Sequence, residues 1–406
     1  MNTIEIGDTV EKLRGLVVDD TVVYRKILTQ AVENTDLCEV VKTAPNGSIA
    51  LDWLAQKEFD VVLLDVFMPE LDGIETLKRI KQQYPHIEVI MISSDGAESV
   101  KNTVKALELG ALEFVLKPTQ GDPERNIEAI TRMLKVLFAQ IQIKKMGRSR
   151  SASAAGGTST RNAGTESRTQ TLGAGKGPGA DPVKKTGVSN KLSTDKIRAH
   201  TPLPNRKKAT FQDADLILIA SSTGGPVALE KVLSQLQEPL KVPLLIVQHM
   251  PKNFTRVLAQ SLNQKSGLHI VEAEENMVIE PGKAIIAAGG YHMIAEEKEG
   301  KKIVKLLETE YVNGVRPAAD VLFSSLTQLY RNQRILVVVL TGMGTDGTKG
   351  VAKLAEETQV FTITQSEDTC VVYGMPRSVD DSGLSDESLA LDLIPARIQS
   401  FGLRRR

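Results

Sequence analysis

A long stretch of small, polar and basic residues divides the chain into two parts. Residues 144–208 hold 15 lysines and arginines against three acidic residues, although the whole chain carries 50 of each sign. Ser, Gly, Thr, Ala and Asn fill most of the remaining positions. Such a stretch buries too little apolar surface to offset its conformational entropy. We therefore predict two folded domains, residues 13–144 and 211–403, joined by a flexible basic linker at residues 145–210.

The remaining bulk properties predict a cytoplasmic protein without membrane insertion. The two cysteines, Cys38 and Cys370, lie far apart and lack the spacing of metal ligands, as is usual in a reducing compartment. The amino terminus has no basic segment followed by an apolar one, and no apolar run reaches the roughly 20 residues that span a bilayer. The linker charge could attract nucleic acid or an anionic membrane. A solvated linker is the favoured interpretation, and we expect no nucleic-acid partner.

The first domain alternates short apolar segments with amphipathic ones. Strands are expected at residues 16–18, 40–43, 61–64, 89–92 and 114–116, and helices lie between and after them, for example at residues 21–33 and 74–84. Five such strand-helix units predict an α/β fold with a doubly wound, (βα)5 parallel sheet. The ligand site of such a sheet lies at the carboxyl ends of its strands.

Polar residues stand at those predicted strand ends. They are Asp19 and Asp20 after the first strand, Asp65 after the third, Ser93 after the fourth and Lys117 after the fifth. Clustered carboxylates bind Mg²⁺, and one carboxylate can attack a phosphoryl group. A lysine would neutralise phosphoryl charge, and a serine would donate a hydrogen bond to a phosphoryl oxygen. Together the five residues predict a Mg²⁺-dependent phosphorylation site.

This domain resembles the receiver domain of two-component response regulators. The matching motifs are Leu-Val-Val-Asp-Asp at 16–20, Leu-Leu-Asp-Val-Phe-Met-Pro-Glu-Leu-Asp-Gly at 63–73 and Phe-Val-Leu-Lys-Pro at 114–118. The resemblance implies that Asp65 is the phosphoacceptor and that a histidine kinase is the phosphodonor. It also implies a Mg²⁺ site formed by Asp19, Asp20, Asp65 and the backbone carbonyl of Phe67. Ser93, Phe114 and Lys117 take the positions of the receiver switch.

The second domain begins with an apolar strand that ends at a serine pair. Residues 216–220 are apolar, Ser221 and Ser222 follow, and two glycines lead into a helical pattern. Either serine would stand at the carboxyl end of a parallel strand, next to the free N–H groups of a helix start. The segment therefore fits either a displayed nucleophile or an ordinary strand-to-helix connection.

A serine nucleophile needs a base and an acid that orients the base. His249 follows the apolar run 243–247 and so shares the rim with the serine pair, whereas His292 is a weaker candidate and His269 would lie at the opposite end. Asp346 belongs to the glycine-rich segment 341–347, which follows a third apolar strand. No Gly-Lys-Ser/Thr sequence follows these glycines, which disfavours a phosphate-binding loop.

The second domain resembles the catalytic domain of the CheB family of chemotaxis protein-glutamate methylesterases. The matching motifs are Ser-Thr-Gly-Gly at 222–225, Gln-His-Met-Pro at 248–251, Arg-Pro-Ala-Ala-Asp-Val-Leu-Phe at 316–323, Thr-Gly-Met-Gly-Thr-Asp-Gly at 341–347 and Cys-Val-Val-Tyr-Gly-Met-Pro at 370–376. The resemblance implies a parallel-sheet α/β hydrolase in which Ser222 is the nucleophile, His249 the base, Asp346 the orienting acid and the Met343 amide an oxyanion donor. It implies no cofactor in the esterase site.

The resemblance also implies a function and its regulation. The substrate would be glutamate methyl esters on a chemoreceptor, with methanol as product, and receptor glutamines would be deamidated. Phosphorylation of the first domain would activate the second. Two alternatives use the receiver differently: a phosphorylation-controlled binding module without serine chemistry, and a DNA-binding regulator. The second half shows no basic recognition helix, which disfavours DNA binding.

Overall fold

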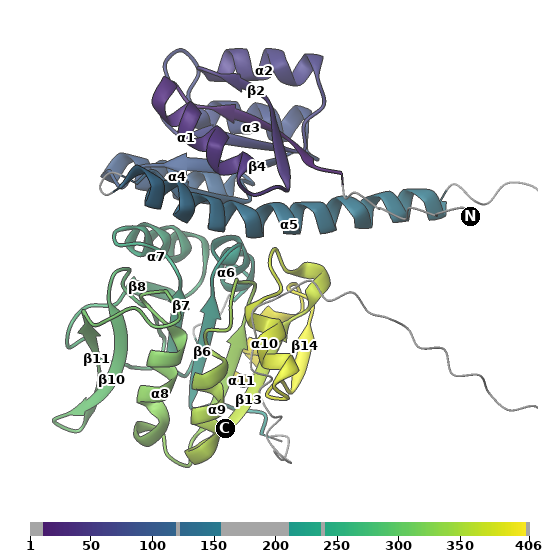
Figure 1. Cartoon of the computed structure of the whole chain (residues 1–406). Coiled ribbons are helices and arrows are strands. Elements are labelled where there is room, and N and C mark those ends of the chain that lie inside the picture. The colour runs from purple at the N-terminus through teal and green to yellow at the C-terminus, as the bar shows by residue number, and fades with distance from the viewer. Residues whose placement is uncertain (1–10, 119–121, 156–210, 237–239, 403–406) are drawn as a thin grey trace, which may run out of the picture. The chain divides into compact units, whose positions relative to one another are not determined.

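The computed structural model describes residues 11–118, 122–155, 211–236 and 240–402. The residues described within 11–143 and 211–402 belong to one compact unit, and a second unit begins at residue 144. The first unit contains two parallel sheets, one in each predicted domain (Figure 1). Each unit is described by itself.

The amino-terminal sheet has five parallel strands in the order β2-β1-β3-β4-β5. Its strands are β1 (Leu13–Val18), β2 (Cys38–Ala44), β3 (Val61–Asp65), β4 (Glu88–Ser93) and β5 (Glu113–Leu116). Its helices are α1 (Val22–Glu33), α2 (Gly47–Gln56), α3 (Gly73–Gln83), α4 (Ala97–Glu108) and α5 (Pro123–Ala155). The predicted strands and the doubly wound fold are confirmed.

Side chains alternate between the two faces of this sheet, and each face has its own core. Leu16 and Leu64 pack in the core that includes residues of α2, α3 and α4. Val17 and Leu63 pack instead with residues of α1 and α5. Because the strands are covered on both faces, they read as nearly continuous apolar runs in the sequence.

The carboxyl-terminal sheet has seven parallel strands in the order β14-β13-β12-β6-β7-β9-β8. In chain order these strands are β6 (Leu216–Ser221), β7 (Leu244–Gln248), β8 (His269–Glu272), β9 (Lys283–Ile286), β12 (Arg334–Val339), β13 (Gln359–Gln365) and β14 (Glu387–Leu389). A separate antiparallel hairpin consists of β10 (His292–Lys298) and β11 (Lys301–Leu307). Since β6 pairs with β12 on one side and β7 on the other, the strand order reverses there, as at a ligand crevice of open α/β sheets.

Helices cover both faces of the seven-stranded sheet (Figure 1). They are α6 (Gly225–Leu233), α7 (Phe254–Lys265), α8 (Ala319–Leu329), α9 (Thr348–Glu357), α10 (Met375–Asp381) and α11 (Ile394–Gly402), with a 3₁₀ turn, η1, at Glu367–Thr369. Ile217 and Ile219 pack with α6, α7 and α11, whereas Leu216 and Leu218 pack with α8, α9 and α10. A parallel-sheet α/β domain was predicted here, and it is confirmed.

Helix α5 continues past the predicted end of the first domain, to Ala155. The segment of the compact unit that holds the receiver ends at Ile143, next to the predicted boundary at residue 144. The rest of the predicted linker, residues 156–210, lies outside the described residues.

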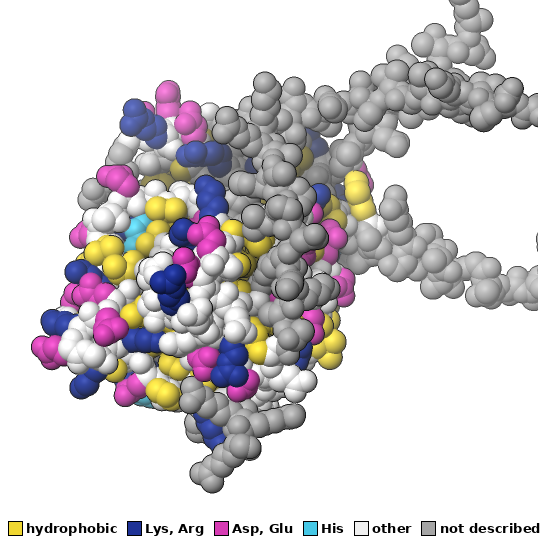
Figure 2. All heavy atoms as spheres, turned by 90° about the horizontal axis from the view of Figure 1, so that it is seen from below, with side chains coloured by type: hydrophobic (Ala, Val, Ile, Leu, Met, Phe, Trp, Pro, Cys, Tyr) yellow, Lys and Arg dark blue, Asp and Glu magenta, His cyan; other side chains and the backbone are white. Residues whose placement is uncertain are grey.

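Two further properties concern helix composition and surface charge. Among the described residues, no helix is both long enough and apolar enough to cross a membrane. On the face drawn in Figure 2, the basic and acidic side chains that are described lie interspersed.

Candidate active site and phosphorylation site

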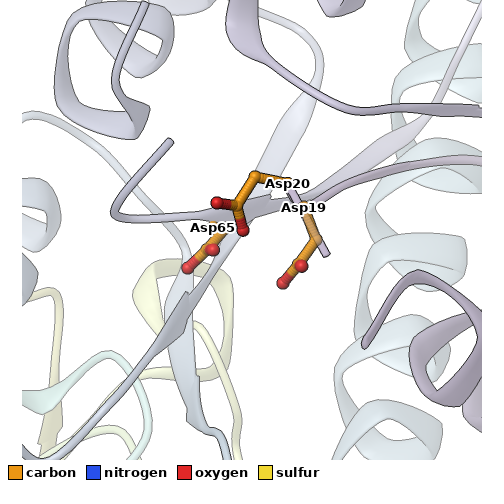
Figure 3. Close-up of side chains that lie close together, drawn as sticks. All are labelled: Asp19, Asp20 and Asp65. Carbon is orange, nitrogen blue, oxygen red and sulfur yellow. The ribbon is translucent and has the colours of Figure 1, made fainter. Parts of the chain in front are cut away.

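Three carboxylates lie together at the carboxyl ends of β1 and β3. One oxygen each of Asp19, Asp20 and Asp65 lies within 4.8 Å of the others. Figure 3 shows the three side chains beside one another. Asp19 and Asp65 are buried, while Asp20 is exposed. The sequence placed these residues at one edge of the sheet because parallel strands end at a common edge, and the structure brings them together.

Lys117 joins this cluster from the end of β5. Its Nζ lies 2.6 Å from Asp65 Oδ2 and 2.8 Å from Asp19 Oδ2. Burial raises the pKa of Asp65 to about 6, and the neighbouring carboxylates of Asp19 and Asp20 add to this, although Lys117 acts in the opposite direction. The cluster therefore holds excess negative charge that one lysine does not fully offset.

The donor set of the cluster fits Mg²⁺. This hard cation takes oxygen ligands, keeps several waters and is usually held by one or two carboxylates. Three carboxylates within 4.8 Å of one another, with one of them exposed, supply that set and leave access for a phosphodonor. Phe67, whose backbone carbonyl is the expected fourth ligand, lies just after β3 with a side chain that is 42% exposed. A receiver fold with this acidic cluster implies Mg²⁺ binding.

The two expected switch residues are both buried and engaged. The Ser93 hydroxyl lies 2.6 Å from Thr103 Oγ1 and 2.9 Å from Ser99 Oγ, both of them on α4. The ring of Phe114 stacks on the ring of Phe254, with centroids 4.8 Å apart and planes 5° from parallel. Ser93 is thus tied to α4, and Phe114 is tied to helix α7 of the carboxyl-terminal domain.

Ser222 lies in a tight turn between β6 and α6. Its backbone N–H donates to Thr341 O at 3.0 Å, and its carbonyl accepts the N–H of Gly225 at 2.7 Å. Gly342, which lies next to Ser222, leaves no room for a larger side chain, since a Cβ on Gly342 would come 2.8 Å from Ser222 Cβ. The serine is therefore held between two strand ends by backbone contacts.

Ser221, the other candidate, is buried and already paired. Its hydroxyl donates to Gln248 Oε1 at 2.6 Å. The Gln248 amide then donates to the carbonyl of Ser222 at 2.9 Å and to that of His249 at 3.3 Å. Ser221 thus supports the turn, whereas Ser222, which is only partly buried, borders the cavity described below.

His249 and Asp346 form a direct pair. His249 follows β7, and its Nε2 lies 2.8 Å from Asp346 Oδ2. The other ring nitrogen, Nδ1, is buried and has no hydrogen-bond partner among the described residues. An imidazole that donates from Nε2 carries its lone pair on Nδ1, so this nitrogen is the one left to accept a proton.

Asp346 is a buried carboxylate surrounded by donors. Burial by itself would raise its pKa, but hydrogen bonds from His249 and from the backbone N–H groups of Ala319 and Asp320 outweigh burial, so its pKa lies below the usual value. The carboxylate is consequently ionised at neutral pH, which is the state that orients and stabilises a charged imidazole.

The weaker candidate base, His292, has a structural environment. It is fully buried, its Nε2 lies 2.9 Å from Glu310 O, and its Nδ1 accepts the N–H of Ala318 at 3.2 Å. Both ring nitrogens are therefore occupied. His269 begins β8, at the strand end opposite to His249, as expected.

The segment after β12 carries the expected oxyanion donor, Met343. The N–H of Gly342 donates to Val372 O at 2.9 Å, and its carbonyl accepts the N–H groups of Gly374 and Met375. These contacts join residues 341–347 to the segment before α10. Met343 follows Gly342, is partly exposed, and lies in the same loop as Asp346.

A cavity of about 310 Å³ borders the serine and the histidine. On one side it is lined by Ser222, Thr223, His249 and Pro251, and on the other by residues of β5 and α5 such as Phe114 and Met133. Glu113 Oε2 accepts the N–H of Gly224, in the turn that contains Ser222, at 3.2 Å. Burial raises the pKa of Glu113 to about 7, although the N–H groups of Phe114 and Gly224 oppose this.

Sequence reasoning missed four residues of this site. Glu113, Gln248, Asn313 and Asp320 all contact groups of the turn or of the Asp346 carboxylate. Gln248 and Asp320 lie inside motifs that carried the family resemblance, which was an available signal. Glu113 and Asn313 act across long sequence separations, and nothing local marks them.

The two domains have the architecture expected of a receiver joined to an α/β hydrolase. Family comparisons agree with this class: a model described as "Response regulator receiver domain" matches residues 16–131, and one described as "CheB methylesterase" matches residues 217–398. A solved structure, the CheB methylesterase catalytic domain of Thermotoga maritima, is 36% identical, with 46% of this chain and 97% of that chain covered and a TM-score of 0.44.

Two curated relatives match almost the whole chain. Each is named protein-glutamate methylesterase/protein-glutamine glutaminase. The protein from Treponema denticola is 35% identical over 396 residues, which is 97% of this chain and 99% of the relative. The protein from Desulfotalea psychrophila is 36% identical over 393 residues, 96% and 98% respectively. The chain belongs to the CheB family and is a protein-glutamate methylesterase with a receiver domain.

Proposed function

We propose that this enzyme hydrolyses glutamate methyl esters on chemoreceptors and that phosphorylation of Asp65 by a histidine kinase activates it. Deamidation of receptor glutamines would use the same site. The observation that carries the proposal is the pairing of His249 with Asp346, 2.8 Å apart, beside Ser222 at neighbouring strand ends. Because the receptor helices that carry these glutamates are cytoplasmic, the enzyme would work in the cytoplasm.

The proposed reaction starts with proton transfer from Ser222 to the free Nδ1 of His249. The hydroxyl oxygen attacks the ester carbonyl, and the imidazolium is stabilised by the ionised Asp346. His249 then returns the proton to the leaving methoxide, which departs as methanol. In the second half, His249 takes a proton from water, the hydroxide attacks the acyl-enzyme, and glutamate and Ser222 are restored.

The developing oxyanion requires N–H donors close to Ser222. The Met343 amide is the proposed donor, since it lies in the loop that Gly342 holds against the nucleophile turn. A preorganised donor of this kind contributes about 3–4 kcal/mol to transition-state stabilisation. The N-terminus of α6 faces the same region through its Gly224 N–H, which Glu113 occupies here.

Contacts between the receiver and the catalytic domain support regulation by occlusion. Glu113 and Phe114 of β5 contact Gly224 and Phe254, and they line the cavity that borders Ser222 and His249. Lys265 of α7 adds an ion pair with Glu108 of α4 at 2.8 Å. When bound, Mg²⁺ would neutralise charge on the phosphoryl group during its transfer to Asp65. The phosphoryl group then adds about −1.5 to −2 charge at the Asp65 end of the sheet. We infer that the resulting shift of Ser93, α4 and Phe114 loosens these contacts.

Methanol release from methylated receptor membranes tests both parts of the proposal. The full-length protein should release methanol, and acetyl phosphate with Mg²⁺ should increase the rate by about tenfold if an interface of about 1.4 kcal/mol is lost. No methanol under either condition would overturn the esterase proposal. Equal rates under both conditions would retain the esterase and overturn regulation by phosphorylation.

Replacing Phe114 by alanine should raise the basal rate of the unphosphorylated enzyme. A stacked aromatic pair contributes about 0.5–1.5 kcal/mol beyond its buried area, so we expect a severalfold to tenfold increase in methanol release without phosphodonor. Ile49→Ala on α2 is the control, since it truncates an apolar side chain of the receiver that is 37% exposed, whereas Phe114 is buried and stacks on Phe254. An F114A basal rate equal to that of I49A would contradict a role of this stack in inhibition.

A further inference from the structure

Two buried carboxylates, Asp346 and Asp320, each accept hydrogen bonds from backbone N–H groups at the start of a helix. Asp346 accepts the N–H groups of Ala319 and Asp320, at 2.5 and 3.1 Å, in the first turn of α8. Asp320 in turn accepts the N–H groups of Gly347 and Gly350, at 3.0 and 2.7 Å, at the start of α9. Each anion thus satisfies free N–H groups at a helix N-terminus, where negative charge is favoured.

One amide bridges the two carboxylates. Asn313 Nδ2 lies 2.8 Å from Asp320 Oδ2 and 2.8 Å from Asp346 Oδ1. An amide nitrogen has two hydrogens, so it can donate one to each carboxylate. Both carboxylates are buried, and without a donor between them two such charges would repel.

The backbone of Asn313 is built for this contact. Asn313 and Gly314 have φ values of 55° and 77°, and Val312 and Val315 exchange both backbone hydrogen bonds. This is the geometry of a two-residue Asn-Gly turn, in which both central residues are left-handed. The turn places the amide over the carboxylate pair while the residue as a whole stays exposed, so its replacement leaves no hole in the core.

We propose that Asn313 is a positioning residue for the esterase reaction: its amide keeps Asp346 and Asp320 side by side as anions, so that Asp346 retains its charge and its alignment with His249. The proposal rests on the function proposed above. Burial and the neighbouring Asp346 already raise the pKa of Asp320, which agrees with two like charges in contact. Among the described residues, the titratable groups with the largest effects on the pKa values of this pair are His249 and the two carboxylates themselves.

The variant Asn313→Gly removes the amide and keeps the turn, because glycine adopts a left-handed conformation readily. Without the amide, repulsion between the two buried carboxylates favours a protonated pair. The pair then takes up a proton at a higher pH, and because Asp346 must be ionised to align His249, the acid limb of the pH-rate profile should move upward by about one pH unit.

The activity test uses the full-length enzyme with acetyl phosphate, Mg²⁺ and methylated receptor membranes. The wild type, N313G and the double variant N313G/D320N are compared from pH 5 to 9. The N313G limb should shift, and the double variant, which carries one charge fewer, should shift back toward the wild type. An N313G profile that has the wild-type shape at a uniformly lower rate would overturn the proposal, because a merely structural role predicts that result.

A stability measurement separates this proposal from the esterase proposal. If N313G raises the pKa of the carboxylate pair in the folded state, its loss of unfolding free energy relative to wild type should grow as the pH rises from 4 to 7. The loss should be smaller in N313G/D320N at pH 7. A pH-independent loss would contradict the bridging role even if the enzyme hydrolyses receptor esters, and a wild type without esterase activity would leave this measurement intact.

Discussion

Replacing Ser222 by alanine should lower the rate of methanol release by about 10³- to 10⁶-fold. The change removes the oxygen that attacks the ester, while His249, Asp346 and the backbone donors remain. Hydrolases that lose one member of a triad retain only the catalysis that their oxyanion donors and substrate binding supply. The measurement is initial-rate methanol release from methylated receptor membranes, with the phosphodonor present.

The control must show that the loss is chemical. Ser400→Ala removes a hydroxyl from the exposed face of α11, where it bonds only locally to Arg397, and should leave the rate within about twofold. Thermal unfolding of S222A should match the wild type within a few degrees. An S222A enzyme that folds and still hydrolyses receptor esters at the wild-type rate would refute the nucleophile assignment.

Replacing Asp65 by asparagine should abolish phosphorylation from acetyl phosphate, with at least about a hundredfold less label incorporated. An amide oxygen is a poor nucleophile compared with a carboxylate, and one ligand of the acidic cluster is lost with it. The unphosphorylated esterase rate should persist, because Asp65 lies in the receiver. Retained labelling would show that another residue accepts the phosphoryl group.

The same variant should be more stable than wild type in the absence of Mg²⁺ at neutral pH. The folded-state pKa of Asp65 is about 6, above its ordinary value of 3.8, so the charged form is disfavoured in the folded protein. This disadvantage costs about 1–3 kcal/mol above pH 6 and disappears as the pH falls through 6 toward 4, where both states become protonated. Unfolding of both proteins between pH 4.5 and 8 checks this, and added Mg²⁺ should stabilise only the wild type.

The fold and the rim residues were predictable because both depend on local signals. Continuous apolar runs such as residues 216–220 and 335–340 are typical of buried parallel strands and not of loops. The polar residues that follow such strands meet at one edge of the sheet. This reasoning brought Asp19, Asp65 and Lys117 together, and it placed His249 beside the serine turn. The choice between Ser221 and Ser222 needed the family motif. The structure then shows that the Ser221 hydroxyl is engaged in a hydrogen bond to Gln248.

The unpredicted residues depend on geometry that the sequence does not encode locally. Asn313 and Gly314 are recognisable as a turn, yet the carboxylate that the turn covers lies 33 positions away. Glu113 begins a buried strand, and its bond to Gly224 spans 111 positions. Contacts between residues so far apart in the sequence depend on how whole domains pack.

The amide of Gln248 links the carbonyl of Ser222, the proposed nucleophile, to the carbonyl of His249, the proposed base. The two loops that end β6 and β7 are thereby joined outside the sheet as well as within it. Thermal displacements of Ser222 and His249 should therefore be correlated, so that their separation fluctuates less than the position of either loop. The receiver can then approach or leave this face while the distance over which the proton must travel stays nearly constant.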